Sequence, residues 1–199
     1  MIIRPQYMNT LKTYRDVPLV KILAGIRRCG KSTILDMLRD DLLKSGIAAD
    51  HIISMRYTSE DFDDGMTGKA MYQGIKEQMT DDGRYYLLLD EVQEIDGWEK
   101  AVNSLLENAN TDIYVTGSNS KLLSGELATY LSGRYIQIQV FPFSLAEAKQ
   151  QCVENGTYTS DEKLFADYLK YGGFPQRFFL PDDHSITTYL DDLYEAIIV

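Results

Sequence analysis

Short apolar runs alternate with amphipathic stretches over the first two thirds of the chain. Five of these runs have strand length and a buried character, which predicts five strands. They are residues 20–24, 52–57, 85–89, 113–116 and 135–140. Apolar residues recur at helical spacing between them, most clearly in residues 32–45 and 98–106. Strands that alternate with helices predict a three-layer α/β domain with a mainly parallel sheet.

The pattern becomes helical from about Ser144 onward. One amphipathic helix stops at Gly172-Gly173, and the last one carries an apolar stripe that reaches Val199. We therefore expect a core over residues 1–143 and a helical lid or linker over residues 144–199. A stripe without a terminal glycine or polar tail predicts that the chain is truncated before a further domain; the alternative is packing on another chain.

Composition and charge narrow the class of protein. Of the 199 residues, 44% are hydrophobic and 25% are charged, which is ordinary for a soluble globular protein. The net charge of −10 argues against broad nucleic-acid binding, although a local basic patch stays compatible with it. The two cysteines make neither a disulfide framework nor a zinc site. With no secretory signal and no apolar run of membrane-spanning length, we expect a cytoplasmic protein without membrane contact.

The strongest motif follows the first expected strand and reads G-x-x-x-x-G-K-S. Backbone N–H groups of such a loop wrap a polyphosphate, and the next helix adds its positive dipole end. In that arrangement Lys31 reaches the β- and γ-phosphates and Ser32 ligates Mg²⁺. The alternative is a glycine-rich turn with an incidental lysine. The predicted nucleotide-binding residues are Gly25, Ile26, Arg27, Arg28, Cys29, Gly30, Lys31, Ser32 and Thr33.

Cys29 lies inside this loop, where a helix N-terminus could lower the pKa of its thiol. A small residue tolerated at a variable loop position is the stronger interpretation, because the motif leaves that position free.

Asp90 and Glu91 end the apolar run 85–89, as the acids of a Walker B strand do. Asp90 is the expected Mg²⁺ acid, and Glu91 is placed to activate a water for attack on the γ-phosphate. Taken alone, the segment also fits a buried strand that ends in a solvated acidic turn. The separation from Lys31 leaves room for one further strand and two helices. The chain lacks the N-K-x-D guanine-reading sequence, which favours adenine.

A polar segment directly follows the fourth expected strand, which we place between the Walker A and Walker B strands. Ser118 or Asn119 would there contact the attacking water or the γ-phosphate, the role called sensor 1. The sequence does not choose between them, and a plain turn rich in turn-forming residues is the alternative.

Together, the segments GIRRCGKS, LLDEVQ and TGSNSKLL resemble the prokaryotic AAA+-like P-loop ATPases over nearly the whole chain. The resemblance implies strand order 5-1-4-3-2, ATP as ligand, Lys31 and Ser32 as phosphate and Mg²⁺ ligands, and Asp90 and Glu91 as metal acid and base. In that family a C-terminal domain with a nuclease-like fold follows the core, and the resemblance implies that this chain lacks it.

Two further segments match this family more weakly. Arg134, in Ser-Gly-Arg, resembles an arginine finger that would act on a neighbouring subunit of a homo-oligomer; a solvated arginine is the alternative. Pro175 follows Gly-Gly-Phe, as does a proline that packs near the adenine in related signal-transduction ATPases. A plain helix stop explains that segment equally well.

The expected function is Mg²⁺-dependent ATP hydrolysis that changes the conformation of an attached domain or partner. A nucleotide-dependent switch with negligible hydrolysis is the second candidate, because an arginine finger supplied only by oligomerisation would leave an isolated domain inactive.

Overall fold

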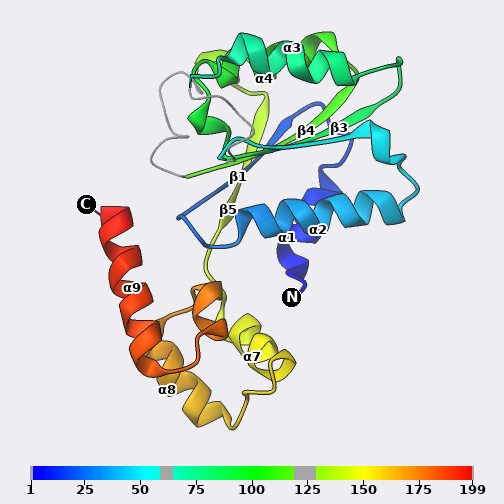
Figure 1. The fold of residues 1–199 in the computed structure, drawn as a ribbon. Coiled ribbons are helices and arrows are strands. Elements are labelled where there is room, and N and C mark those ends of the chain that lie inside the picture. Colours follow the sequence, from blue (N-terminus) through cyan, green and yellow to red (C-terminus); the bar gives the residue numbers. More distant parts are fainter. Residues whose placement is uncertain (1, 59–64, 119–128, 199) are drawn as a thin grey trace. The chain divides into compact units, whose positions relative to one another are not determined.

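The computed structural model describes residues 2–58, 65–118 and 129–198 (Figure 1). The chain divides into two compact units. The sheet unit comprises Pro5–Gly25 and Lys31–Gln139, and the helical unit comprises Met1–Arg4, Ile26–Gly30 and Val140–Val199. No helix within the described ranges is long and apolar enough to cross a bilayer.

Five strands form one sheet, in the order β2-β3-β4-β1-β5. Their bounds are β1 Val20–Gly25, β2 Ile52–Arg56, β3 Tyr85–Asp90, β4 Thr111–Gly117 and β5 Tyr135–Val140. β1 pairs with β4, β4 with β3 and β3 with β2, each time in parallel. The predicted fold class and the predicted order 5-1-4-3-2 are confirmed. After β1 the chain forms β2 at the edge of the sheet and then β3 beside it. β4 then fills the position between β3 and β1.

Helices cover both faces of this sheet (Figure 1). α3 (Gly68–Gln78) and α4 (Trp98–Asn108) lie on one face, and α1 (Pro5–Thr13) and α2 (Lys31–Lys44) on the other. Each helix buries one stripe: Ile34, Leu38 and Leu42 of α2 recur every four residues and are fully buried. Two short 3₁₀ turns, Ala49–His51 and Val92–Glu94, connect elements. α1 was not anticipated from the sequence.

A buried ion pair links β1 to β4. Lys21 Nζ lies 2.5 Å from Asp112 Oδ1, and both side chains are fully buried. The Tyr114 hydroxyl donates to Asp112 Oδ2 at 2.8 Å, and the Asp16 N–H donates to the same oxygen at 3.0 Å. Burial lowers the pKa of Lys21 in spite of its acidic partner. The pair is therefore compensated by hydrogen bonds, as a buried charge requires.

The helical unit contains α7 (Leu145–Glu154), α8 (Asp161–Tyr171), the 3₁₀ helix η3 (Pro175–Phe179) and α9 (Asp183–Ile198). Ser144 and Glu147 form a reciprocal capping box at the start of α7, and Ser160 caps α8. Gly173 follows α8 and has room for no side chain, because a Cβ there would lie 2.0 Å from the Phe143 carbonyl oxygen.

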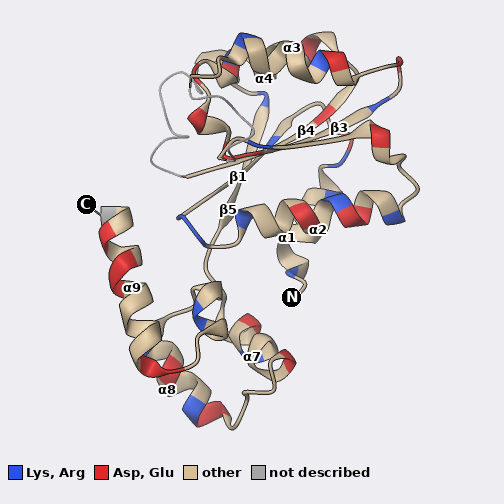
Figure 2. Cartoon of the chain, viewed as in Figure 1, with Lys and Arg blue, Asp and Glu red and all other residues tan. Residues whose placement is uncertain are grey.

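Charged residues are distributed over the helices of both units, with Lys and Arg interspersed among Asp and Glu (Figure 2).

Candidate functional site

The carboxyl ends of β1 and β3 bring Lys31 of the phosphate loop and Glu91, the predicted general base, together. Lys31 is the first residue of α2 and is only 3% exposed. Its ammonium group donates to the Gly25 carbonyl at 3.1 Å and lies 3.5 Å from Glu91 Oε1. Parallel strands of one sheet end at the same edge, and only β4 separates β1 from β3, which explains why residues so far apart in sequence meet here.

Asp90 is buried, and both of its carboxylate oxygens have partners. The Thr116 hydroxyl donates to Oδ1 at 2.5 Å, and Arg56 Nε donates to Oδ2 at 3.0 Å. Arg56 ends β2 and also lies 3.7 Å from Asp36 Oδ2. A hydroxyl and a guanidinium therefore hold the carboxylate expected to bind the metal.

Arg56 and Thr116 were missed by the sequence analysis. The signal was present for Arg56, because in a parallel pair the last residues of β2 and β3 are register partners. No motif marks Thr116, which lies within β4 and precedes the predicted sensor residues Ser118 and Asn119.

Glu91 has a left-handed backbone, with φ 56° and ψ 46°. Its N–H donates to Thr116 Oγ1 at 2.9 Å, and Gln93 Nε2 donates to its carboxylate at 2.5 Å. A non-glycine residue in this conformation costs on the order of 1–3 kcal/mol, so its surroundings must hold it there. Thr116 contributes by binding the backbone of Glu91 and the side chain of Asp90 with one hydroxyl.

Residues Ile26–Gly30 of the phosphate loop belong to the helical unit. Arg28 and Gly30 have positive φ values of 62° and 99°, which turn the backbone sharply. A Cβ on Gly30 would lie 3.7 Å from Arg4 Nη1 and 4.0 Å from Pro175 Cγ. Pro175 therefore lies beside the loop. Cys29 is fully buried, which argues against the reactive-thiol interpretation.

Arg4 binds the backbone of the Ile26–Gly30 segment, and no motif in the sequence indicated this role. The residue is 2% exposed, and its Nη1 donates to the Cys29 carbonyl at 3.1 Å. Its Nη2 donates to the Phe141 carbonyl at 2.9 Å, and its Nε pairs with Glu147 Oε1 at 2.8 Å. Burial alone would raise the pKa of Glu147, but the hydrogen bonds from Arg4 and Ser144 hold it below its ordinary value.

The remaining predicted site residues have different surroundings. Ser118 is half-buried just after β4, and Asn119 lies outside the described residues. Arg134 is exposed, donates to Asn103 Oδ1 at 2.9 Å and pairs with Glu107 of α4. The structure of this chain alone therefore does not bring Arg134 to Lys31 or Asp90, and its action on a neighbouring subunit stays a prediction.

The donors present fit ATP with Mg²⁺. Lys31 offers a buried positive charge at a helix start, while Ser32 and Asp90 offer oxygen ligands. Within the described ranges no group of three or more His, Cys, Asp or Glu residues could hold a metal by itself. A P-loop site has this character, because its Mg²⁺ is shared with phosphate oxygens.

A protein-family model described as "AAA domain" matches residues 18–149. The chain belongs to this family of AAA-type P-loop ATPases. The matched range contains the phosphate loop, Asp90, Glu91, Thr116 and Arg134, and the five strands β1 to β5 also fall within it.

Two relatives of the AAA domain are similar over most of its length. An uncharacterized protein of Haemophilus influenzae is 38% identical over 200 residues, which cover 100% of this chain and 50% of the relative. An uncharacterized protein of Methanocaldococcus jannaschii is 27% identical over 196 residues, covering 90% of this chain and 42% of the relative. The chain spans about half the length of the curated relatives it matches.

Solved structures share the fold at low identity. A Walker-type ATPase of Pyrococcus abyssi aligns with TM-score 0.63 and 14% identity, over 99% of this chain and 73% of that one. AMPPCP-bound DnaA from Aquifex aeolicus aligns with TM-score 0.57 and 17% identity, over 98% and 62%. At such identity the likeness shows the fold alone.

Proposed function

We propose that the AAA domain binds ATP with Mg²⁺ and hydrolyses it, and that turnover changes the conformation of the helical segment, an attached domain or a partner. The observation that carries this proposal is the convergence of Lys31, Asp90 and Glu91 at one edge of the sheet. A phosphate-binding cation, a metal-binding acid and a candidate base are the minimum set for this reaction.

Each residue has a separate role in the proposed reaction. Bound Mg²⁺ would offset phosphate charge, with Ser32 and Asp90 as its ligands. Lys31 binds the β- and γ-phosphates and gives up its contact with Glu91 to do so. The freed Glu91 carboxylate takes a proton from water as the water oxygen bonds to the γ-phosphorus and the bond to the β–γ bridging oxygen breaks. Ser118 or Asn119 orients that water as sensor 1.

A nucleotide-dependent switch is the second candidate, and two contacts favour it. Glu91 is paired with Lys31, and Asp90 is paired with Arg56, so both acids have positively charged partners within the chain itself. A domain that binds ATP without releasing Glu91 would hold the nucleotide and not hydrolyse it.

The two candidates differ in how turnover depends on protein concentration. Phosphate release should be measured for the wild-type chain over a range of concentrations, with Glu91→Gln beside it. Glu91→Gln is expected to bind ATP normally and to lose turnover by about 100-fold or more, as for removal of a general base. Glu94→Gln is the matched control, because Glu94 is an exposed glutamate in the adjoining turn. Undiminished turnover in Glu91→Gln would remove Glu91 as the base.

Turnover per subunit that rises with concentration would indicate completion of the site by a neighbour. In that case Arg134→Ala is expected to abolish the rise and to leave ATP affinity unchanged. Tight ATP binding without turnover at any concentration would instead support the switch.

A further inference from the structure

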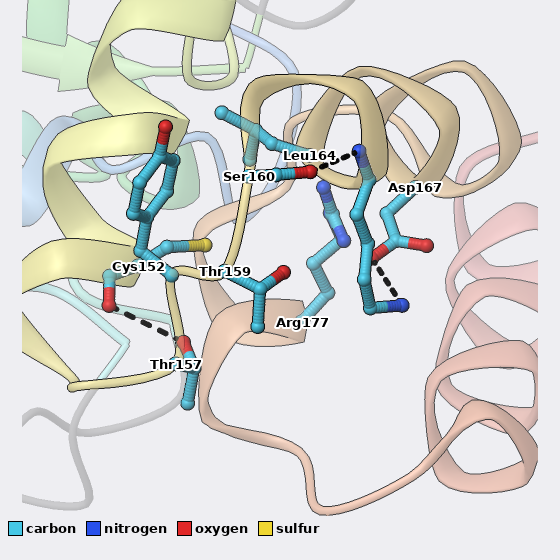
Figure 3. A pocket seen from close by; sticks show the side chains of 9 residues that line it. Cys152, Thr157, Thr159, Ser160, Leu164, Asp167 and Arg177 are labelled. Carbon is cyan, nitrogen blue, oxygen red and sulfur yellow. Dashed lines mark hydrogen bonds and ion pairs between the residues drawn. The ribbon is translucent and has the colours of Figure 1, made fainter.

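The helical unit contains a cavity of about 50 Å³, lined by residues of α7, α8, η3 and the segment between α7 and α8 (Figure 3). Cys152, Ser160, Lys163, Asp167 and Arg177 are among the residues that line it. None of these residues belongs to the phosphate loop or to the Walker B strand, so the nucleotide site does not account for the cavity.

Arg177 is the feature that points to a ligand. The residue is 5% exposed, and its side chain extends from η3 between Thr159 and Asp167 (Figure 3). Its Nε donates to the Gly172 carbonyl at 2.6 Å, and its guanidinium lies 4.1 Å from the centroid of the Phe178 ring. Nη2 is buried and has no hydrogen-bond partner among the described residues. A buried donor on a charged group is costly to leave unpaired.

The start of α8 adds a second source of positive potential. Ser160 caps this 11-residue helix by accepting from the Lys163 N–H at 3.2 Å, and Ser160 lines the cavity. A helix N-terminus carries a partial positive charge, which favours an anion there.

The charges around the cavity limit the kind of anion. Arg177 and Lys163 contribute two positive charges, and Asp167 contributes one negative charge, held 3.3 Å from Lys163 Nζ. The net charge of +1 matches one singly charged group. A doubly charged phosphate would be left with an excess negative charge beside Asp167, whereas a carboxylate matches both the charge and the planar fork of a guanidinium.

We propose that this cavity binds a carboxylate, with the Arg177 guanidinium as the principal donor. The volume suits the carboxylate group itself, so the rest of the ligand extends out of the cavity. The carboxylate comes either from a small free acid or from an acidic side chain or C-terminus of a peptide. This site is separate from ATP binding and hydrolysis.

Cys152 provides a direct readout, because it lines the same cavity and is partly exposed. The rate at which iodoacetamide alkylates Cys152 should be followed by peptide mass spectrometry while acetate is titrated at constant ionic strength. We expect saturable protection of Cys152 with a millimolar apparent Kd, and weaker protection by inorganic phosphate. No protection, or equal protection by phosphate, would overturn the proposal. No nucleotide is present, so the result does not depend on the ATPase proposal.

Two substitutions at the rim of the cavity are expected to change acetate affinity in opposite directions, and both leave the buried Arg177 in place. Lys163→Gln should weaken acetate binding about 2- to 5-fold, since exposed charge pairs are worth up to about 1 kcal/mol. Asp167→Asn should tighten it by a similar factor, because it removes the competing carboxylate. Lys170→Gln is the matched control: Lys170 lies on the same helix, is 61% exposed against 64% for Lys163, and does not line the cavity.

Arg177→Gln should abolish protection, and circular dichroism will show whether this variant folds. If it does not fold, the opposite effects of Lys163→Gln and Asp167→Asn on acetate affinity still test the proposed site. Equal effects of Lys163→Gln and Lys170→Gln would mean that acetate acts only through general charge, and would refute the site.

The two sources of the carboxylate are separated by a pair of short peptides. A glutamate-containing peptide that protects Cys152 at lower concentration than acetate, while its glutamine analogue does not, would assign the site to a peptide carboxylate. Protection by acetate without gain from the peptide would assign it to a small free acid.

Discussion

Replacing Thr116 by valine removes one hydroxyl and keeps the shape of a fully buried side chain. That hydroxyl donates to Asp90 Oδ1 at 2.5 Å and accepts from the Glu91 N–H at 2.9 Å. A hydrogen bond to a charged group contributes about 1.5–3 kcal/mol, and an unpaired backbone N–H costs about 1 kcal/mol where water can reach it. Glu91 is half-buried, so we apply this cost of about 1 kcal/mol to its N–H. The free energy of unfolding should therefore fall by about 2.5–4 kcal/mol.

Urea denaturation followed by tryptophan fluorescence measures this loss. Trp98 is the single tryptophan of the chain and is buried in the same unit as Thr116, so its emission reports the unfolding of the sheet unit. Thr116→Ser is the matched control, because serine keeps the hydroxyl and loses one methyl group, at a cost of about 1 kcal/mol. If valine and serine variants differ by less than about 0.5 kcal/mol with unchanged m-values, the hydroxyl does not make these two contacts and the reasoning fails.

Three other residues give sharp expectations. Lys31→Ala should weaken ATP binding about 10- to 100-fold in calorimetry, as loss of charge-assisted hydrogen bonds implies, and retained affinity would refute the loop assignment. Asp112→Asn leaves Lys21 buried without a counter-charge and should lower the free energy of unfolding by about 3–5 kcal/mol in urea; a loss below about 1 kcal/mol would show that the pair contributes little. Because contact with Arg4 holds the pKa of Glu147 below its ordinary value of 4.5, the pair should stabilise the chain fully above that pH and lose its contribution as the pH falls through the lower folded-state value. Glu147→Gln should flatten that part of a stability profile against pH, and an unchanged profile would contradict the assignment.

Much of the fold was predictable because its signals are local. Buried strands such as Tyr85–Asp90 are continuous apolar runs, and α2 carries an apolar stripe directly after the loop. The sheet order followed from the resemblance. α1 was missed because its nine residues bury only Tyr7, Met8 and Leu11, too short a pattern to distinguish from an irregular segment.

The convergence of Lys31, Asp90 and Glu91 was predictable for a physical reason. Asp90 ends β3, Glu91 follows it, and Lys31 follows the loop after β1; because parallel strands end at one edge of the sheet, the topology places the three residues together. Which strand-end residues make the contacts was not predictable to the same degree. Arg56 and Thr116 contact Asp90 because of register, which depends on how two strands pair.

Arg4 and Arg177 show where sequence reasoning meets its physical limit. Both arginines are at least 95% buried, although arginine is ordinarily an exposed residue. Each donates to backbone carbonyls, those of Cys29 and Phe141 for Arg4 and that of Gly172 for Arg177. A carbonyl oxygen exists at every position and carries no side-chain signature, so no spacing or motif can mark the partner in advance. Only the folded chain reveals that Arg4 has acceptors for its guanidinium while Nη2 of Arg177 is left with none, and that difference separates a structural anchor from a binding group.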